Sequence, residues 1–157
     1  MSAIRVIQFT DPHLFGNPAE TLRGVNTLET LERTLADASG HISIADAVLV
    51  TGDLVQDDPG GYEHFRRLFA RLGKPVLCIP GNHDLVPEMR AALAGPPFEL
   101  DGPSDFGAWR IVLLDSVVAN QAGGHICEEM LAKLDDCLLY TSPSPRDRSV
   151  SRMPSSA

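Results

Sequence analysis

The chain has 157 residues, of which 43% are hydrophobic and 22% charged, a composition typical of one soluble globular domain. Its formal net charge of -8 argues against a basic surface for nucleic acid or for anionic membranes. No stretch has the pattern of a signal peptide or the length of a transmembrane helix, and the three cysteines contain no C-x-x-C pair. We therefore expect a cytoplasmic protein with reduced thiols that binds neither nucleic acid nor membrane.

The first half of the chain alternates strand and helix patterns. Residues 4–9 are a short apolar run that predicts a buried strand, and residues 47–51 predict a second one. A helix with Asn26 as its N-cap and Gly40 as its stop is predicted between them, and a further helix is expected to end at Gly73. The apolar residues at helical spacing are Leu28, Leu31 and Leu35 in the first helix and Phe65, Leu68, Phe69 and Leu72 in the second.

The pattern continues with a strand over residues 75–79 and a short helix over 87–94 that has proline near its start. Residues 95–107 are rich in Gly and Pro and are expected to form a loop, before another strand over 109–115. A last helix is expected over 126–138. This order predicts an α/β fold with a mixed, mostly parallel sheet and flanking helices.

The composition changes near the end of the chain. Residues 138–157 include six Ser and three Pro but no Gly, and the string from Cys137 to Asp147 resembles a translated sequencing adapter. Such a Ser/Pro/Arg segment cannot bury much apolar surface. We expect residues 1–137 to form the N-terminal part of a folded domain and residues 138–157 to be a disordered or non-native tail.

Three polar motifs directly follow the first three predicted strands. They are Asp11-Pro12-His13, Gly52-Asp53 and Gly81-Asn82-His83-Asp84. Each motif alone also fits a plain turn with a capping aspartate. Together they favour a ligand site, because the carboxyl ends of parallel strands meet at one edge of a sheet. Carboxylate, amide and imidazole groups suit Mn²⁺, Fe or Zn²⁺, and the mixture is too rich in nitrogen for a dedicated Ca²⁺ or Mg²⁺ site.

These motifs resemble a known family. Residues 7–14, 48–54 and 79–84 are similar to the first three signature blocks of calcineurin-like metallophosphoesterases. Within that family the Gly-Asp-Leu form and the short spacing look most like bacterial phosphodiesterases that act on 3′,5′-cyclic AMP. The resemblance implies a partial αββα sandwich, of which this chain would be the N-terminal half.

The resemblance also implies a site with two divalent metal ions, Fe²⁺ or Mn²⁺, with Zn²⁺ as an alternative. Asp11 and His13 would bind the first ion, Asp53 would bridge the two, and Asn82 would bind the second and contact substrate. A bridging ligand must be an anion with two usable oxygens, which Asp53 can supply and Asn82 cannot. The ions would polarise the phosphoryl group and activate water against phosphorus.

Two neighbouring residues are implied to act beside the metals. His83 would contact the phosphate or protonate the leaving group. Asp84 would fix the tautomer of His83 and raise its pKa, although a helix-capping carboxylate is an equal alternative.

The later part of the family pattern is absent from this sequence. The family continues with a Gly-His or His-His block and a closing Gly-His-x-His block, whereas the only later histidine here is His125. His125 and Cys127 could form a variant closing block, but we expect His125 to be an exposed loop residue. His41 and His64 are also expected at the surface. With four protein ligands in place of seven, the chain by itself is expected to be inactive or nearly so.

The leading hypothesis is a phosphodiesterase for a small substrate such as cyclic AMP. A nuclease, a nucleotide pyrophosphatase or a phosphomonoesterase would use the same site, but the acidic composition disfavours a nuclease. A protein phosphatase is disfavoured because no Asp-Arg-Gly follows Gly52-Asp53. A non-catalytic metal- or nucleotide-binding module is the alternative from another class. No pattern in the sequence indicates an oligomeric state.

Overall fold

The computed structural model describes residues 3–119 and 121–141, with side chains up to residue 138. The chain divides into two compact units, Met1–Ile126 and Cys127–Ala157. The first unit contains all three motifs that follow the predicted strands, so the architecture of this unit decides whether they meet.

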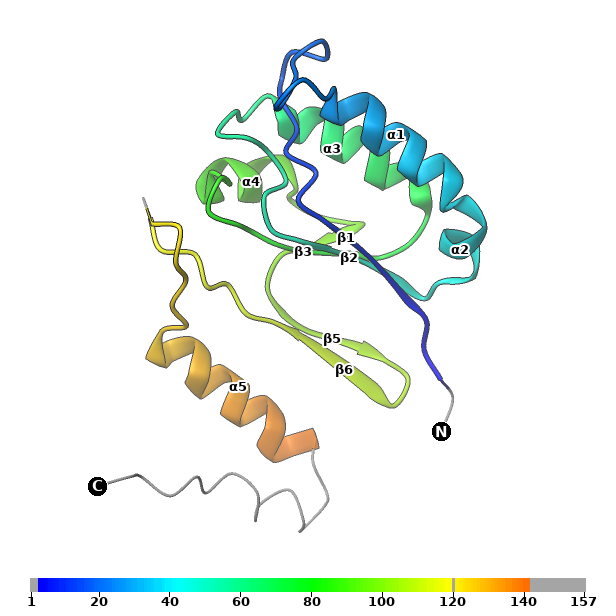
Figure 1. Ribbon diagram of the computed structural model, residues 1–157. Coiled ribbons are helices and arrows are strands. Elements are labelled where there is room, and N and C mark those ends of the chain that lie inside the picture. Colours follow the sequence, from blue (N-terminus) through cyan, green and yellow to red (C-terminus); the bar gives the residue numbers. More distant parts are fainter. Residues whose placement is uncertain (1–2, 120, 142–157) are drawn as a thin grey trace, which may run out of the picture. The chain divides into compact units, whose positions relative to one another are not determined.

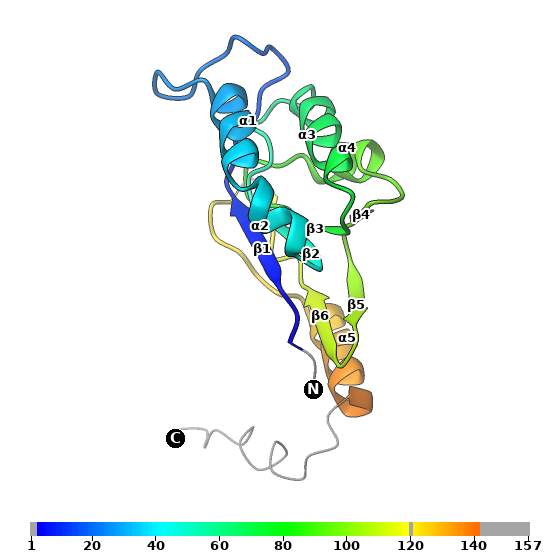
Figure 2. The ribbon, with the colours of Figure 1, turned by 90° about the vertical axis from the view of Figure 1, so that its right-hand side faces the viewer.

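A four-stranded parallel sheet with the order β1-β2-β3-β4 forms the centre of the first unit (Figure 1). Its strands are β1 (Val6–Thr10), β2 (Ala47–Thr51), β3 (Val76–Ile79) and β4 (Phe98–Glu99). Crossover connections in parallel sheets have one hand, so strands added in one direction place their helices on one face. The helices on that face are α1 (Thr27–Asp37), α2 (Ser39–Ile44), α3 (Gly61–Phe69) and α4 (Val86–Ala92) (Figure 2).

The two faces of the sheet belong to two apolar clusters. Side chains alternate along a strand, so Val48 and Val50 pack toward the helices while Ala47 lies on the other face. The helix-side cluster is the larger one and contains Phe65 and Phe69 from α3. On the other face, an antiparallel hairpin of β5 (Gly102–Phe106) and β6 (Trp109–Leu113) packs against β2 and β3. The α/β class and the mostly parallel sheet expected from the sequence are confirmed.

Helix ends account for two successes and one error of the sequence analysis. The side-chain oxygen of Asn26 accepts a hydrogen bond from the backbone N–H of Glu29 at 2.9 Å, so the predicted N-cap is confirmed. Gly73 follows a short 3₁₀ turn, η1 (Ala70–Leu72), with φ of 66°, as expected for a helix stop. Gly40 is not a stop, because α1 already ends at Asp37 and Gly40 lies inside α2.

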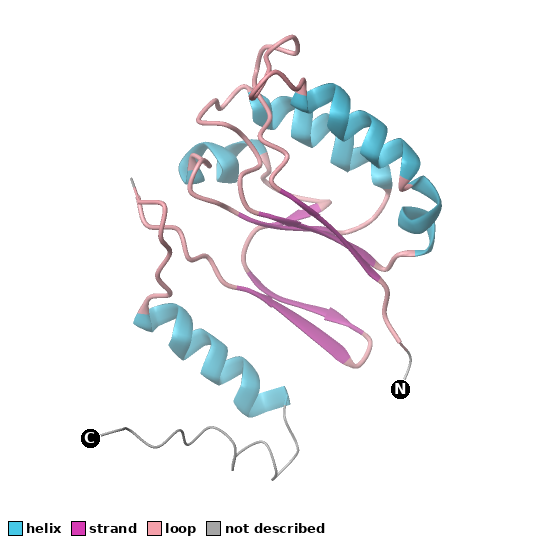
Figure 3. Ribbon diagram, viewed as in Figure 1, coloured by secondary structure: helices cyan, strands magenta, loops and turns pink. Residues whose placement is uncertain are grey.

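The segment predicted as a Gly/Pro-rich loop is partly extended. Residues 95–107 contain β4 and β5, the first strand of the hairpin (Figure 3). The sequence of β5, Gly-Pro-Ser-Asp-Phe, lacks the apolar alternation that identifies a strand. Its pairing with β6 fixes it in place, and this long-range contact leaves no local signal.

The second unit contains one described helix, α5 (Glu128–Thr141), which confirms the helix expected near residues 126–138. An ion pair between Lys133 and Glu129, one turn apart, supports it at 2.8 Å. The helix continues past the expected domain boundary at residue 137, and the rest of the tail lies outside the described residues. Within the described residues, no helix is both long and apolar enough to cross a membrane.

Truncation of Phe65 tests the larger apolar cluster. Phe65 is fully buried and stacks on Phe69 with a centroid distance of 4.3 Å. We expect Phe65→Ala to lower the free energy of unfolding by about 3–5 kcal/mol, because it removes a buried ring and leaves a cavity. Urea unfolding followed by circular dichroism measures the loss. The control is Ile44→Ala, since Ile44 is 60% exposed and its truncation should change stability little. Equal losses in both variants would contradict this account of the core.

Candidate metal centre

The loops that follow β1, β2 and β3 are joined by hydrogen bonds beyond the ends of the strands. The backbone N–H of His13 donates to the carbonyl of Asp53 at 2.9 Å, and that of Gly52 donates to the carbonyl of Ile79 at 2.9 Å. The backbone N–H of His83 donates to Oδ1 of Asp53, also at 2.9 Å. The three polar motifs are therefore held together by their own backbone, as the strand order predicts.

The backbone is unusual at each of the three residues that carry candidate ligands on the first two loops. Asp11, His13 and Asp53 have φ values of 52°, 45° and 42°, in the left-handed region that few residues other than glycine adopt. Asp, Asn and His are the types that tolerate it best. Such strained conformations concentrate at functional sites, where the surrounding structure enforces them.

Gly81 is required by the close approach of two of these loops. A β-carbon at this position would overlap both the backbone nitrogen and the carboxylate of Asp53. The glycine of the Gly-Asn-His-Asp motif therefore allows the loop after β3 to pack directly against the residue that lies at the centre of the site.

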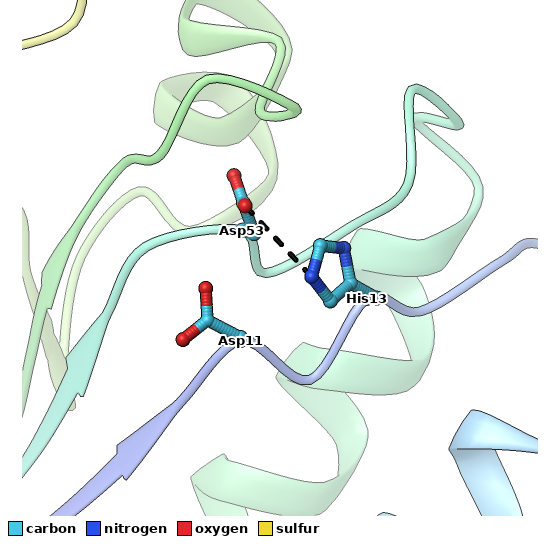
Figure 4. Close-up of side chains that lie close together, drawn as sticks. All are labelled: Asp11, His13 and Asp53. Atoms are coloured by element: carbon cyan, nitrogen blue, oxygen red, sulfur yellow. Dashed lines mark ion pairs between the residues drawn. The ribbon is translucent and has the colours of Figure 1, made fainter. Parts of the chain in front are cut away.

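Three side chains converge at this edge of the sheet. One ligand atom from each of Asp11, His13 and Asp53 lies within 4.8 Å of the other two (Figure 4). Nε2 of His13 is 3.8 Å from Oδ2 of Asp53, and the hydroxyl of Thr10 donates to Oδ2 of Asp11. Asp53 is only 9% exposed, so its charge is well shielded from water. The predicted grouping of these residues is present in the structure.

The arrangement fits a bound cation. Two carboxylates and an imidazole form a donor set that suits Mn²⁺, Fe or Zn²⁺. Nε2 of His13 and Oδ2 of Asp53 face each other at 3.8 Å, beyond hydrogen-bond distance, so a cation can lie between these two donors. A buried carboxylate beside a second one also needs a positive charge nearby.

His83 lies beside the cluster, and Asn82 precedes it on the same loop. The rings of His83 and His13 are 5.5 Å apart, and His83 lines the same open cleft as Asp11, His13 and Asp53. Asn82 is exposed on the adjoining loop and lines the neighbouring cleft together with His83.

Asp84 makes neither of the contacts predicted from the sequence, which were with His83 or with the start of a helix. Its carboxylate oxygens accept hydrogen bonds from the backbone of Leu54, Val55 and Gly81 and from the hydroxyl of Tyr62. It does not hold the ring of His83, and it does not cap α4, whose N-cap is Leu85. Burial raises the pKa of the Asp84 carboxyl, although the four donors oppose that effect. The buried side chain of Asp84 therefore connects the loops after β2 and β3 by hydrogen bonds.

The partner of His83 is a residue that the sequence analysis missed. Nδ1 of His83 lies 2.9 Å from Oδ2 of Asp57 and 2.8 Å from Nε2 of Gln56. This hydrogen bond to His83 is the main reason why the pKa of the Asp57 carboxyl lies below its ordinary value. The available signal was an acidic residue four positions after Asp53, on the same loop.

Arg23 is a second residue that was missed. It lines the open cleft around the cluster and carries a full positive charge. Arg23 and Gly24 have φ values of 51° and 82° in a two-residue turn, closed by hydrogen bonds between Leu22 and Val25. The Arg-Gly pair in the sequence indicates a turn, but it does not show that this turn lies beside the other motifs.

The remaining histidines lie elsewhere. His125 is an exposed loop residue and His41 is exposed in α2, as expected. His64 in α3 is half-buried, with Nε2 at 3.0 Å from the carbonyl of Gly16, so it is more than a plain surface residue.

Comparison with known proteins identifies the family. A calcineurin-like phosphoesterase model matches residues 4–142. The chain belongs to the calcineurin-like phosphoesterase family. Members of this family use divalent metals, in agreement with the ligand cluster of Asp11, His13 and Asp53.

Several relatives have named activities. The chain is 37% identical over 137 residues to the 3′,5′-cyclic adenosine monophosphate phosphodiesterase CpdA of Haemophilus influenzae, which covers 86% of this chain and 50% of that protein. The protein of the same name from Escherichia coli is 37% identical over 134 residues, covering 84% and 49%. A 3′,5′-cyclic-nucleotide phosphodiesterase of Nostoc is 28% identical over 143 residues, covering 90% and 54%. The chain spans about half the length of the curated relatives it matches.

Substitution of Gly81 tests whether close loop packing shapes the metal centre. We expect Gly81→Ala to weaken Mn²⁺ binding by roughly tenfold or more, the effect of disturbing the support of a metal ligand. Isothermal titration calorimetry with MnCl₂ measures it. Gly40→Ala is the matched control, because Gly40 lies in a helix with open space around it. Unchanged affinity in Gly81→Ala would show that Asp53 does not contribute to a metal site here.

Proposed function

We propose that this sequence belongs to a metal-dependent phosphodiesterase that hydrolyses 3′,5′-cyclic nucleotides, converting cyclic AMP to AMP. The observation that carries the proposal is the convergence of Asp11, His13 and Asp53 beside His83. The names of the relatives as cyclic AMP phosphodiesterases support the choice of substrate. Because the chain spans about half of those relatives, the activity is proposed for the full-length protein.

The proposed roles follow from the chemistry of each side chain. Asp11 and His13 would hold one ion through a carboxylate and an imidazole, and Asp53 would contribute its carboxylate to both ions, because it is an anion with two oxygens. Asn82 offers an amide oxygen for the second ion and an N–H group for the substrate phosphate. When bound, the paired cations polarise the phosphoryl oxygens and activate water.

His83 is the proposed proton donor for the departing ribose oxygen. Asp57 lies 2.9 Å from Nδ1, so it holds a proton on that nitrogen of the protonated ring and leaves Nε2 to act toward the substrate. Asp57 therefore takes the positioning role that the sequence analysis assigned to Asp84.

We further propose that the present chain is inactive or nearly so without additional ligands. Asp11, His13, Asp53 and Asn82 supply four donors, and the sequence lacks the two later histidine blocks of the family pattern. Two ions held by so few groups would bind weakly. The same observation favours a second candidate, a module that binds metal without catalysis.

Metal analysis combined with a hydrolysis assay distinguishes these candidates. The purified chain should bind Mn²⁺ yet hydrolyse cyclic AMP and bis(p-nitrophenyl) phosphate at no more than trace rates. A chimera that adds the C-terminal half of the Escherichia coli relative supplies the remaining ligands and should restore turnover of cyclic AMP. A folded, metal-loaded chimera without turnover would favour the non-catalytic module. Full activity of the chain alone would refute the proposal that it needs additional metal ligands.

The active chimera also tests the role of His83. We expect His83→Ala to retain its metals but to lose roughly 100-fold or more of kcat, the usual contribution of a general acid. Asp57→Asn should retain metals as well and reduce kcat by a smaller factor, because it leaves His83 present but poorly oriented. The control is Asp37→Asn, at the end of α1 and far along the sequence from the loops. Unchanged turnover in His83→Ala would refute the proton-donor role.

A further inference from the structure

A second cleft adjoins the metal centre. Its volume is about 660 Å³, and it lies between the loop after β3 and the described residues of the loop after β6. Its size is within the range that holds small organic ligands. His83 lines both this cleft and the cleft of the metal cluster, so the two clefts adjoin at this side chain. A molecule whose phosphate is held at the cluster can therefore extend into the second cleft.

The wall of this cleft combines apolar surface with carboxylates. Pro87 on one side and Val117 and Val118 on the other supply apolar contacts. Glu88 and Asp115 line it as well, and no Lys or Arg is among the described residues that line it. One oxygen of Asp115 accepts a hydrogen bond from the backbone N–H of Val117 at 2.8 Å, which fixes the orientation of this carboxylate.

This lining restricts the chemistry of the occupant. Ionised carboxylates accept hydrogen bonds and do not donate them, so Glu88 and Asp115 favour a group that carries N–H donors. They repel a second phosphate at their end of the cleft, since no Lys or Arg among the described lining residues compensates their charge. The apolar wall favours a flat ring that can exclude water. An uncharged heteroaromatic ring with an amino group meets all three conditions.

We infer that this cleft binds the base of the substrate nucleotide and selects an amino-bearing base, with Glu88 and Asp115 as the specificity-determining residues. The inference rests on the proposed function, because it assumes that the phosphate of a nucleotide lies at the metal cluster.

The test measures nucleoside binding without phosphate, so that it does not depend on metals or turnover. The chain, labelled with ¹³C at Val and Ala methyl groups, is titrated with adenosine and with purine riboside, which differs from adenosine only in lacking the amino group. We expect adenosine to shift the methyl signals of Val117, Val118 and Ala119 at millimolar concentrations, with purine riboside at least about fivefold weaker, the loss of one hydrogen bond.

Charge removal in the cleft provides the matched variants. Glu88→Gln and Asp115→Asn should each reduce the preference for adenosine over purine riboside severalfold, while Glu63→Gln, which removes the same charge from the exposed face of α3, should not. Equal binding of the two nucleosides, or an absence of shifts at these methyl groups, would overturn the inference. Choline shifting the same signals more strongly than adenosine would also overturn it, because the cleft would then select a cationic head group.

The outcome is separable from that of the proposed function. If adenosine binds but the chimera does not hydrolyse cyclic AMP, the assignment of the base cleft stands and the proposed phosphodiesterase activity is refuted. Turnover by the chimera with no preference for the amino group would leave the enzyme intact and refute the assignment of Glu88 and Asp115.

Discussion

The site depends on one constraint, the contact between the loop after β3 and Asp53. The backbone N–H of His83 binds the Asp53 carboxylate, and only glycine at position 81 lets the two loops approach so closely. This contact orients the carboxylate toward His13 and brings the ring of His83 to the same cleft. The buried Asp84 links the loops after β2 and β3 to each other and to Tyr62 of α3 through four hydrogen bonds. The candidate ligand cluster at this edge of the sheet is thus held in place by backbone contacts.

Much of this could be predicted from the sequence, because the informative signals were local. Apolar runs located β1, β2 and β3, and polar motifs at their ends predicted the grouping of Asp11, His13 and Asp53. The partner of His83 could not be predicted in the same way. Asp84 is adjacent to His83 in sequence, yet its side chain points into the protein, whereas Asp57 reaches the ring from another loop. The extended β5 was missed for a related reason, since its pairing partner supplies what its composition lacks.

The one-sided arrangement of helices explains how one edge of the sheet can serve two clefts. Each crossover returns on the helix face, so all three strand-to-helix loops open at the same edge. The hairpin of β5 and β6 covers the opposite face of β2 and β3, and its exit brings Asp115 toward that edge. The candidate metal ligands therefore lie on the loops after β1 and β2, and the second cleft lies between the loops after β3 and β6 of the same unit.

The left-handed backbone at Asp11 and Asp53 has a consequence for how this chain can change over time. Loss of either carboxylate to alanine would remove a ligand and would also place a poorly suited residue in a conformation that the loop still demands. Asparagine avoids the second penalty, because it adopts this conformation almost as readily as aspartate. A lineage that abandons metal chemistry while keeping this fold should therefore drift toward asparagine at these two positions, and its amides would mark where the ions once bound.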